Sequence, residues 1–213
     1  MKKMKKFELT SETKINIFGK KLFRIKALIS FADVEAGETG GWVEKEGNVN
    51  QSGDAWVSGN AEVSGNAEVY GNAKVYGNAK VYGNAEVSGN AEVSGNAEVS
   101  GNAEVSGDAW VYGNAEVSGN AEVSGDAKVY GNAEVYGDAE VYGNADYTTI
   151  HGFGTQFRTT TFFRCKDKKV RVACGCFFGT IPEFREQVKN TRKGKIAEEY
   201  LMIADLMEKH FEK

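Results

Sequence analysis

The side chains best suited to catalysis or metal binding are few in this chain of 213 residues. Two histidines and three cysteines could act as bases, nucleophiles or metal ligands: His151, His210, Cys165, Cys174 and Cys176. Their spacings match no tetrahedral zinc motif, and an odd number of cysteines argues against a disulfide framework. We therefore predict no catalytic residue, no metal site and no cofactor, and the free thiols favour a reducing cytoplasm.

The cysteines lie in a segment whose pattern predicts a β-hairpin. Residues 159–165 and 170–176 are rich in β-branched and aromatic side chains and flank a turn at 166–169. One face of this hairpin is expected to carry the apolar side chains: Cys165, Cys174, Cys176, Phe163, Val170 and Val172. Because free cysteine is among the most buried residue types, we interpret this face as a core beneath two helices.

The opposite face of the hairpin is expected to carry Phe162, Arg164 and Arg171. Arginines interleaved with an aromatic ring can hold a phosphate beside a stacked base. Charge favours the same unit: residues 152–213 contain thirteen basic and eight acidic residues, whereas residues 41–151 contain four and seventeen. We predict that these three residues bind a small anionic ligand such as a nucleotide; an ordinary exposed polar face is the alternative.

A six-residue repeat fills the middle of the chain and determines where the C-terminal segment is held. A glycine recurs every sixth residue from Gly53 to Gly143, sixteen times, and opens units of the form Gly-(Asn/Asp)-Ala-x-Val-x. Two degenerate units at Gly41 and Gly47 share this register. Alanine and valine, two residues apart, face one side of a four-residue strand, and Gly-Asn makes a corner. The pattern predicts a coil that stacks on itself around a narrow Ala/Val interior.

The outward positions of the repeat carry aromatic residues that we expect to contact partners. Trp56 and Trp110 are 54 residues apart, which is compatible with three coils of eighteen residues, but the spacing alone does not fix the number of units in a coil. Both are predicted to be exposed anchors on one column. The two alignments that follow assume three units per coil. Tyr70, Tyr76 and Tyr82 should ring one coil. Five glutamates eighteen residues apart should form a stack: Glu68, Glu86, Glu104, Glu122 and Glu140. Like charges repel in such a stack, so it either binds cations or a basic partner, or is tolerated because the side chains are exposed.

The two ends differ from the repeat, so we divide the chain at residues 1–40, 41–146 and 147–213. In the first part, alternating segments on either side of a turn predict a β-hairpin that caps the open strand edges. In the last part, the hairpin precedes two helices. The first opens with a capping box from Thr180 to Glu183. The second follows Gly194, with apolar residues at helical spacing: Ile196, Tyr200, Ile203, Met207 and Phe211.

The phase Val-x-Gly-Asn-Ala-x resembles the hexapeptide repeat of left-handed parallel β-helices. That resemblance implies a mostly β protein with three hexapeptides per coil and about five or six coils, bounded by an N-terminal β cap and a small C-terminal α+β unit. The leader LFRIKALISFADVEAGETGGWVEKEGNV and the tail TTTFFRCKDKKVRVACGCFFGTIPEFREQV resemble those of phage and prophage hexapeptide-repeat proteins of unestablished function. The resemblance therefore implies a phage protein in the cytoplasm of a bacterial host.

Many proteins of this fold class are acyltransferases, which use a histidine base between helices and a loop thrown out of a coil. Here neither histidine lies in the repeats and no loop interrupts them, so we expect no enzyme. We predict a binding or interaction scaffold instead. A counter-defence protein that sequesters a host nucleotide signal and an acidic rod that mimics DNA are the alternatives. The expected partners are further copies of the chain in a homo-oligomer such as a trimer, a host protein or a small anionic nucleotide. We expect no membrane and no nucleic acid as partners.

Overall fold

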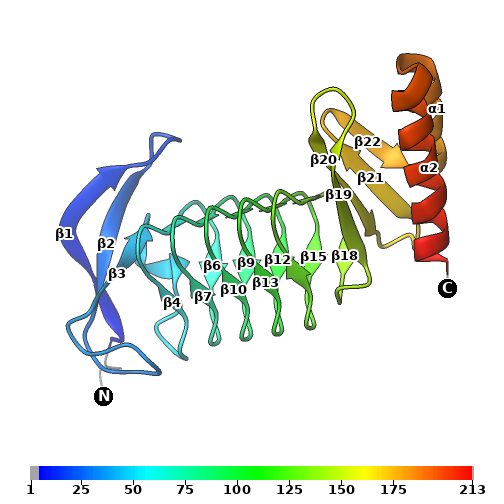
Figure 1. Ribbon diagram of the computed structural model, residues 1–213. Helices are drawn as coiled ribbons and strands as arrows, with labels where there is room; N and C mark the ends of the chain where they lie inside the picture. The colour runs from blue at the N-terminus through cyan, green and yellow to red at the C-terminus, as the bar shows by residue number, and fades with distance from the viewer. Residues whose placement is uncertain (1–4, 213) are drawn as a thin grey trace.

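The structure is a computed structural model that describes residues 5–212. It is a rod with a different unit at each end: the N-terminal strands lie at one end and the C-terminal helices at the other (Figure 1). Within the described residues, no helix combines the length and the apolar character needed to cross a bilayer.

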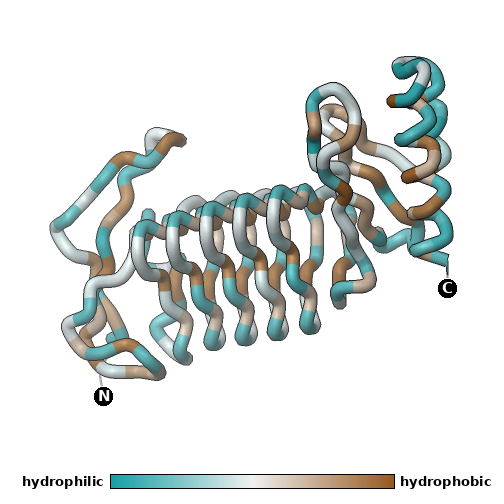
Figure 2. Tube along the Cα trace, in the orientation of Figure 1, coloured by the Kyte–Doolittle hydropathy of each residue, from teal (hydrophilic) through white to brown (hydrophobic). Residues whose placement is uncertain are grey.

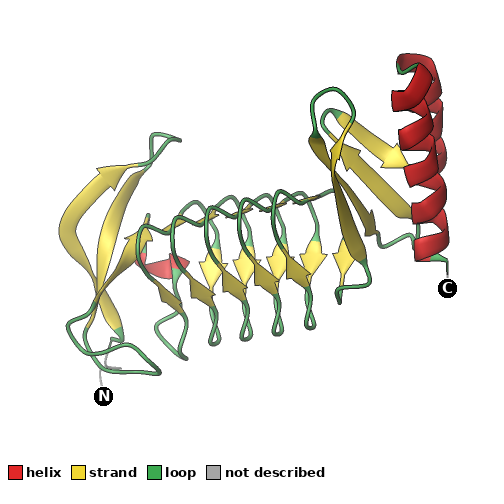
Figure 3. Ribbon diagram, viewed as in Figure 1, coloured by secondary structure: helices red, strands yellow, loops and turns green. Residues whose placement is uncertain are grey.

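The rod is a parallel β-solenoid of about six turns with eighteen residues per turn. Each strand pairs with the strand eighteen residues away, as Glu92 does with Trp110, which confirms three hexapeptides per coil. The strands lie on the sides of the coils and loops form the corners (Figure 3). The strands of the regular coils are β4 (Trp56–Val57), β5 (Glu62–Val63), β6 (Glu68–Val69), β7 (Lys74–Val75), β8 (Lys80–Val81), β9 (Glu86–Val87), β10 (Glu92–Val93), β11 (Glu98–Val99), β12 (Glu104–Val105), β13 (Trp110–Val111), β14 (Glu116–Val117), β15 (Glu122–Val123), β16 (Lys128–Val129), β17 (Glu134–Val135) and β18 (Glu140–Val141).

The interior of the rod is made of the alanines and valines of the repeat, all of them fully buried from Ala55 to Val141. Hydrophobic and hydrophilic residues alternate around every coil in Figure 2. The strands are two residues long, shorter than the four predicted. The repeat glycines from Gly53 to Gly137 turn the chain at the corners with a positive φ, for example +70° at Gly101. A Cβ at Gly101 would lie only 2.9 Å from backbone atoms of Gly119 in the next coil, so the corner requires glycine.

The corner asparagines form ladders that run along the rod. The side-chain amide of Asn60 donates to the side-chain oxygen of Asn78 at 3.3 Å, and Asn78 donates to Asn96 at 3.1 Å. Another ladder ends at Asp108, whose carboxylate accepts a hydrogen bond from the side-chain amide of Asn90 but has no N–H group to donate to the next coil. The asparagine amides are therefore used within the rod.

The N-terminal unit continues one of the three solenoid sheets. Strands β1 (Phe7–Ile15) and β2 (Lys21–Ala27) form the predicted antiparallel hairpin, and β2 pairs with β3 (Thr39–Val43), which pairs with β5. A 3-10 helix, η1 (Glu46–Asn48), leads into the regular coils. The ammonium of Lys6 donates to the carbonyl oxygens of Gly53 and Ala55 at 3.2 and 2.7 Å, so this unit satisfies backbone groups at the open end of the rod.

The C-terminal unit is a four-stranded antiparallel sheet with two helices. Its strands are β19 (Tyr147–Phe153), β20 (Arg158–Arg164), β21 (Val170–Cys174) and β22 (Phe177–Thr180), followed by α1 (Ile181–Thr191) and α2 (Gly194–Phe211). The hairpin β20–β21 and the capping box of α1 confirm the predictions, whereas β19 and β22 were not predicted. The hydroxyl of Thr180 accepts from the Glu183 amide at 3.4 Å, and Glu183 accepts from the Thr180 amide at 2.7 Å.

Both faces of this sheet are covered. One face closes the end of the solenoid, and its side chains Tyr147, Phe163, Cys165 and Ala173 belong to the solenoid core. The other face packs against α1 and α2 in a second core. The sheet also meets the open strand edges: the Thr161 hydroxyl accepts from the backbone amide of Glu134 at 3.0 Å, and the Tyr147 hydroxyl donates to the carbonyl of Lys128. The sheet is thus the C-terminal cap of the rod.

Candidate functional site

The predicted site of Phe162, Arg164 and Arg171 is not assembled on one exposed face. Residues opposite each other in antiparallel strands share a face, and Phe162 is opposite Val172 whereas Arg171 is opposite Phe163. Phe162 therefore points toward the helices, where it is fully buried, and Arg171 lies on the side of the solenoid. The assignment of these three residues to one exposed face is wrong, because Phe162 is buried beneath the helices and the strand register places Arg171 on the opposite face.

Both arginines of that prediction already have acidic partners. Nε of Arg164 lies 3.3 Å from a carboxylate oxygen of Asp146, and its guanidinium covers the ring of Phe211 with 5.2 Å to the ring centroid. Arg171 forms an ion pair with Asp167 at 2.6 Å. These arginines hold the sheet to its surroundings.

The three cysteines are also divided between the faces. Cys165 is buried against the solenoid end, where burial raises the pKa of its thiol to about 11. Cys174 lies on the helix side and accepts a hydrogen bond from the Thr160 hydroxyl at 3.1 Å, while Cys176 is exposed beyond the turn at Gly175. The predicted common cysteine face is therefore wrong. Within residues 5–212, no group of three or more His, Cys, Asp or Glu side chains is arranged to hold a metal ion.

The two tryptophans share one column but not one environment. Trp56, Lys74, Glu92 and Trp110 follow each other in register along one solenoid sheet, as predicted. Trp110 is 43% exposed, whereas Trp56 is 4% exposed because Phe7 and Phe31 of the N-terminal unit pack against it. The prediction that Trp56 is an exposed anchor is wrong, and Trp110 keeps the exposure that a partner contact needs.

The three tyrosines Tyr70, Tyr76 and Tyr82 follow one another at the three corners of a coil and are half-buried. Each hydroxyl donates to a glutamate of the next coil: Tyr70 to Glu86 at 2.8 Å, Tyr76 to Glu92 at 2.7 Å and Tyr82 to Glu98 at 3.0 Å. These tyrosines therefore link successive coils.

The predicted glutamate column is present, since Glu68, Glu86, Glu104, Glu122 and Glu140 pair in register. The C-terminal unit neutralises its last two members. Lys166 lies 2.5 Å from Glu122, and Lys168 lies 3.0 Å from Glu140. The end of the column is thus a contact between the solenoid and its cap.

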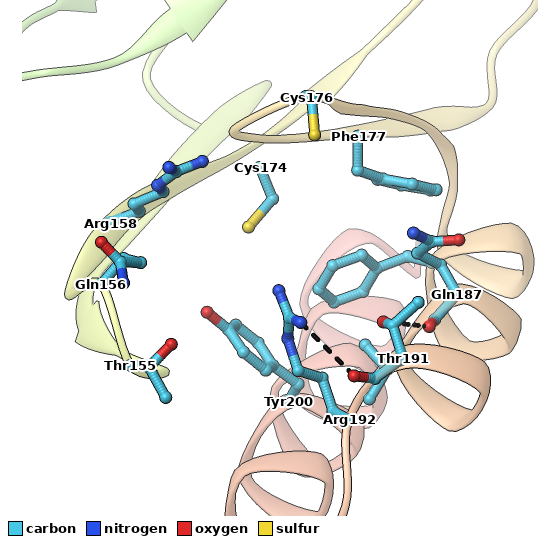
Figure 4. Close-up of a pocket in the computed structure, with 12 residues that line it drawn as sticks. Thr155, Gln156, Arg158, Cys174, Cys176, Phe177, Gln187, Thr191, Arg192 and Tyr200 are labelled. Atoms are coloured by element: carbon cyan, nitrogen blue, oxygen red, sulfur yellow. Dashed lines mark hydrogen bonds between the residues drawn. The ribbon is translucent and has the colours of Figure 1, made fainter.

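A pocket that the sequence did not predict lies between the C-terminal sheet and the helices (Figure 4). Its volume is about 160 Å³. The turn between β19 and β20, the turn between β21 and β22, helix α1 and the start of α2 contribute its walls. Its lining comprises Thr155, Gln156, Arg158, Cys174, Cys176, Phe177, Phe184, Gln187, Val188, Thr191, Arg192 and Tyr200.

The floor of the pocket is apolar and fixed. Phe184 packs edge-on against Tyr200 with 5.8 Å between ring centroids, and both belong to the core beneath the helices. The Tyr200 hydroxyl donates to the carbonyl of Phe153 at 3.3 Å. A Cβ at Gly154 would overlap this hydroxyl, so glycine is needed for the close approach of the turn.

The rim of the pocket is polar and positively charged. Arg158 reaches over Gly175, where a Cβ would overlap its Nη1 atom. Arg192 lies at the other side, and Figure 4 shows it beside Tyr200. Burial is the main cause that raises the pKa of Tyr200, and the charges of Arg192 and Arg158 act in the opposite direction. Both arginines line the pocket, and its lining includes no acidic residue.

The sequence contained only an indirect signal for these two arginines. Arg158 precedes a predicted strand and Arg192 lies between two predicted helices, so neither shared a face with an aromatic residue in the pattern. The net positive charge of residues 152–213 was the one feature that pointed to this unit.

The chain matches no protein-family model and no curated protein. The fold and the geometry of the pocket are therefore the basis for assigning a function.

Proposed function

We propose that this chain is a non-catalytic binding scaffold whose C-terminal unit binds a small ligand in the pocket between the sheet and the helices. The contrast between the rod and this unit is the observation that supports the proposal. From Trp56 to Val141 the coils direct Ala and Val into a closed core and use their asparagines in ladders. The pocket, by contrast, combines an apolar floor with polar and charged groups at its rim, as ligand sites do.

The positions of the histidines support a binding role over acyl transfer. His151 is exposed on β19, with Nδ1 3.2 Å from the Thr159 hydroxyl, and His210 is exposed near the end of α2. Neither lines the pocket or lies in a coil. Acyl transfer in this fold class uses a histidine base beside the coils, so it remains the disfavoured alternative.

The wider setting of the proposal rests on the sequence resemblance. We infer from it a left-handed solenoid, a phage or prophage origin and the cytoplasm of a bacterial host. A homo-oligomer, for instance a trimer, and a host protein docked on Trp110 and the tyrosine ring remain proposed partners. Sequestration of a nucleotide is compatible with the charge of the pocket. Mimicry of DNA is less well supported, because Lys166 and Lys168 neutralise part of the acidic column.

A pocket-blocking variant tests the proposal. Thr191 is exposed at the rim, and Thr191→Trp should fill the pocket without disturbing the buried floor. Lys189→Trp places the same side chain on α1 outside the pocket. Ligand-detected NMR of the full chain against a library of neutral, cationic and anionic small molecules should find ligands whose binding is lost in Thr191→Trp and kept in Lys189→Trp. A library in which no binding depends on position 191, or turnover of an acyl donor, would contradict the proposal.

A further inference from the structure

We propose that the C-terminal pocket is an oxyanion site in which Arg158 and Arg192 hold the phosphate group of a small phosphate monoester. This inference rests on the proposed ligand-binding function of the same pocket and names the chemistry of its ligand. Arg158 approaches from the sheet and Arg192 from the connection between α1 and α2.

Arg158 and Arg192 differ from the other arginines of the C-terminal unit because they form no ion pair in the part of the chain that the structure describes. Residues 147–213 contain five arginines. Three of them form ion pairs with carboxylates at 2.6–3.3 Å: Arg164 with Asp146, Arg171 with Asp167, and Arg185 with Asp205 and Glu208. Among the described residues, Arg158 and Arg192 have no acidic side chain within 4.0 Å, and both line the pocket. The two arginines of the unit without such a partner are therefore both at the pocket, and Arg158 also lines a second hollow with Glu134.

The guanidinium N–H groups of Arg158 and Arg192 are available to bind a ligand. A guanidinium has five N–H donors, arranged so that two can bind one phosphate together. The Arg192 guanidinium has one long hydrogen bond, 3.4 Å from Nη1 to the backbone carbonyl of Thr191. Arg158 is positioned by its packing over Gly175, which has a φ of +59° and no side chain in the way. Both guanidinium groups therefore keep N–H donors that a ligand could use.

The size and composition of the pocket favour a small phosphate ester. Its volume of about 160 Å³ is below the roughly 300–1,000 Å³ of pockets that enclose drug-sized ligands. A phosphate group with a small apolar or ring-shaped substituent suits this space. The phosphate would lie between the two arginines, and the substituent would lie on Phe184 and Tyr200. Two arginines also balance the double negative charge of a phosphate monoester better than the single charge of a carboxylate.

The test is calorimetric titration of the full chain with phenyl phosphate, inorganic phosphate and uncharged benzyl alcohol. Arg158→Gln and Arg192→Gln should each weaken the binding of phenyl phosphate by about tenfold or more, and the double variant should abolish it. The control is the double variant Lys189→Gln and Lys195→Gln, which removes the same charge from α1 and α2 outside the pocket. The control should change the dissociation constant by no more than about twofold.

The outcomes separate this inference from the proposed function. Equal weakening in the arginine and lysine variants would mean that overall charge attracts the anion and would overturn the oxyanion site. Binding of benzyl alcohol that Thr191→Trp blocks, without binding of either phosphate, would also overturn it while the ligand-binding function stands. If none of the three compounds binds, the oxyanion site is rejected, and the library experiment with Thr191→Trp then decides the proposed function on its own. Melting curves from circular dichroism verify that each variant is folded, since both arginines are exposed.

Discussion

Phe162 and Phe163 are neighbours in the sequence and both are fully buried, yet their rings lie in two different hydrophobic cores. Phe162 packs edge-on against Phe184 of α1 with 6.3 Å between centroids. Phe163 faces the end of the solenoid, 6.1 Å from the ring of Tyr136. One strand therefore joins the two helices to the rod, and the C-terminal unit is both a cap and the support of the pocket.

The two phenylalanines should have separable effects when each is replaced by alanine. Phe162→Ala and Phe163→Ala should each destabilise the fold by about 3–5 kcal/mol, because each removes a buried aromatic ring. Hydrogen exchange should show faster exchange in α1 and α2 for Phe162→Ala, and in β16 to β18 and the cap for Phe163→Ala. The same exchange pattern in both variants would mean that the two cores are not distinct.

The tryptophan column offers a matched pair. Trp56→Ala should cost about 3–5 kcal/mol and loosen the N-terminal unit, because Trp56 is buried between Phe7 and Phe31. Trp110→Ala removes the same side chain from an exposed position in the same column and should change stability by only about 0.5 kcal/mol. Urea denaturation of the two variants provides the comparison. Equal destabilisation would contradict the burial difference along this column.

Much of the rod could be predicted from the sequence because its order is local. The spacing of alanine and valine fixes which side chains face inward. The number of units in a coil came from the resemblance to hexapeptide-repeat β-helices, and it predicted which residues stack, such as Glu104 on Glu122. The shorter strands could not be predicted, since the pattern alone does not separate the end of a strand from the start of a corner.

The pocket could not be predicted because its residues meet only through the tertiary structure. Alternation along one strand correctly separated Phe162 from Phe163, but the register between the two strands could not be predicted. Arg171 was expected on the face of Phe162, whereas the observed pairing places it opposite Phe163. Arg158 and Arg192 come together only because β19 adds to the sheet and the helices fold back across it.

Whole coils should be removable from the rod. Deleting residues 87–104 joins Glu86 to Val105 and keeps every inward position in phase, because strands pair at intervals of eighteen residues. Deleting residues 87–95 instead exchanges inward and outward positions at the junction. We expect a cooperative melt with a β-type circular dichroism spectrum for the first deletion and loss of cooperativity for the second. Equal damage from the two deletions would contradict the eighteen-residue coil.

Cys165 should make the stability depend on pH in the alkaline range. Burial raises the pKa of the Cys165 thiol in the folded protein to about 11, whereas the pKa of a cysteine in an unfolded chain is about 8.5. Above pH ~8.5 the unfolded chain loses a proton that the folded chain keeps, so the contribution of Cys165 is full below that pH and is lost by about pH 11. The difference in unfolding free energy between the wild type and Cys165→Ala should therefore shrink from pH 8 to pH 10.5. A difference that stays constant over this range would mean that the thiol is not desolvated.

The central claim, that this protein binds an anionic ligand between Arg158 and Arg192, is tested most directly by the NMR signals of the arginine Nε–Hε groups. The chain has six arginines, and the variants Arg158→Gln and Arg192→Gln assign the two signals that matter. On titration of the full chain with phenyl phosphate, the signals of Arg158 and Arg192 should shift together and saturate, while the signals of the ion-paired Arg164, Arg171 and Arg185 stay in place. Shifts that are spread evenly over all six arginines, or that are absent from Arg158 and Arg192, would contradict the claim.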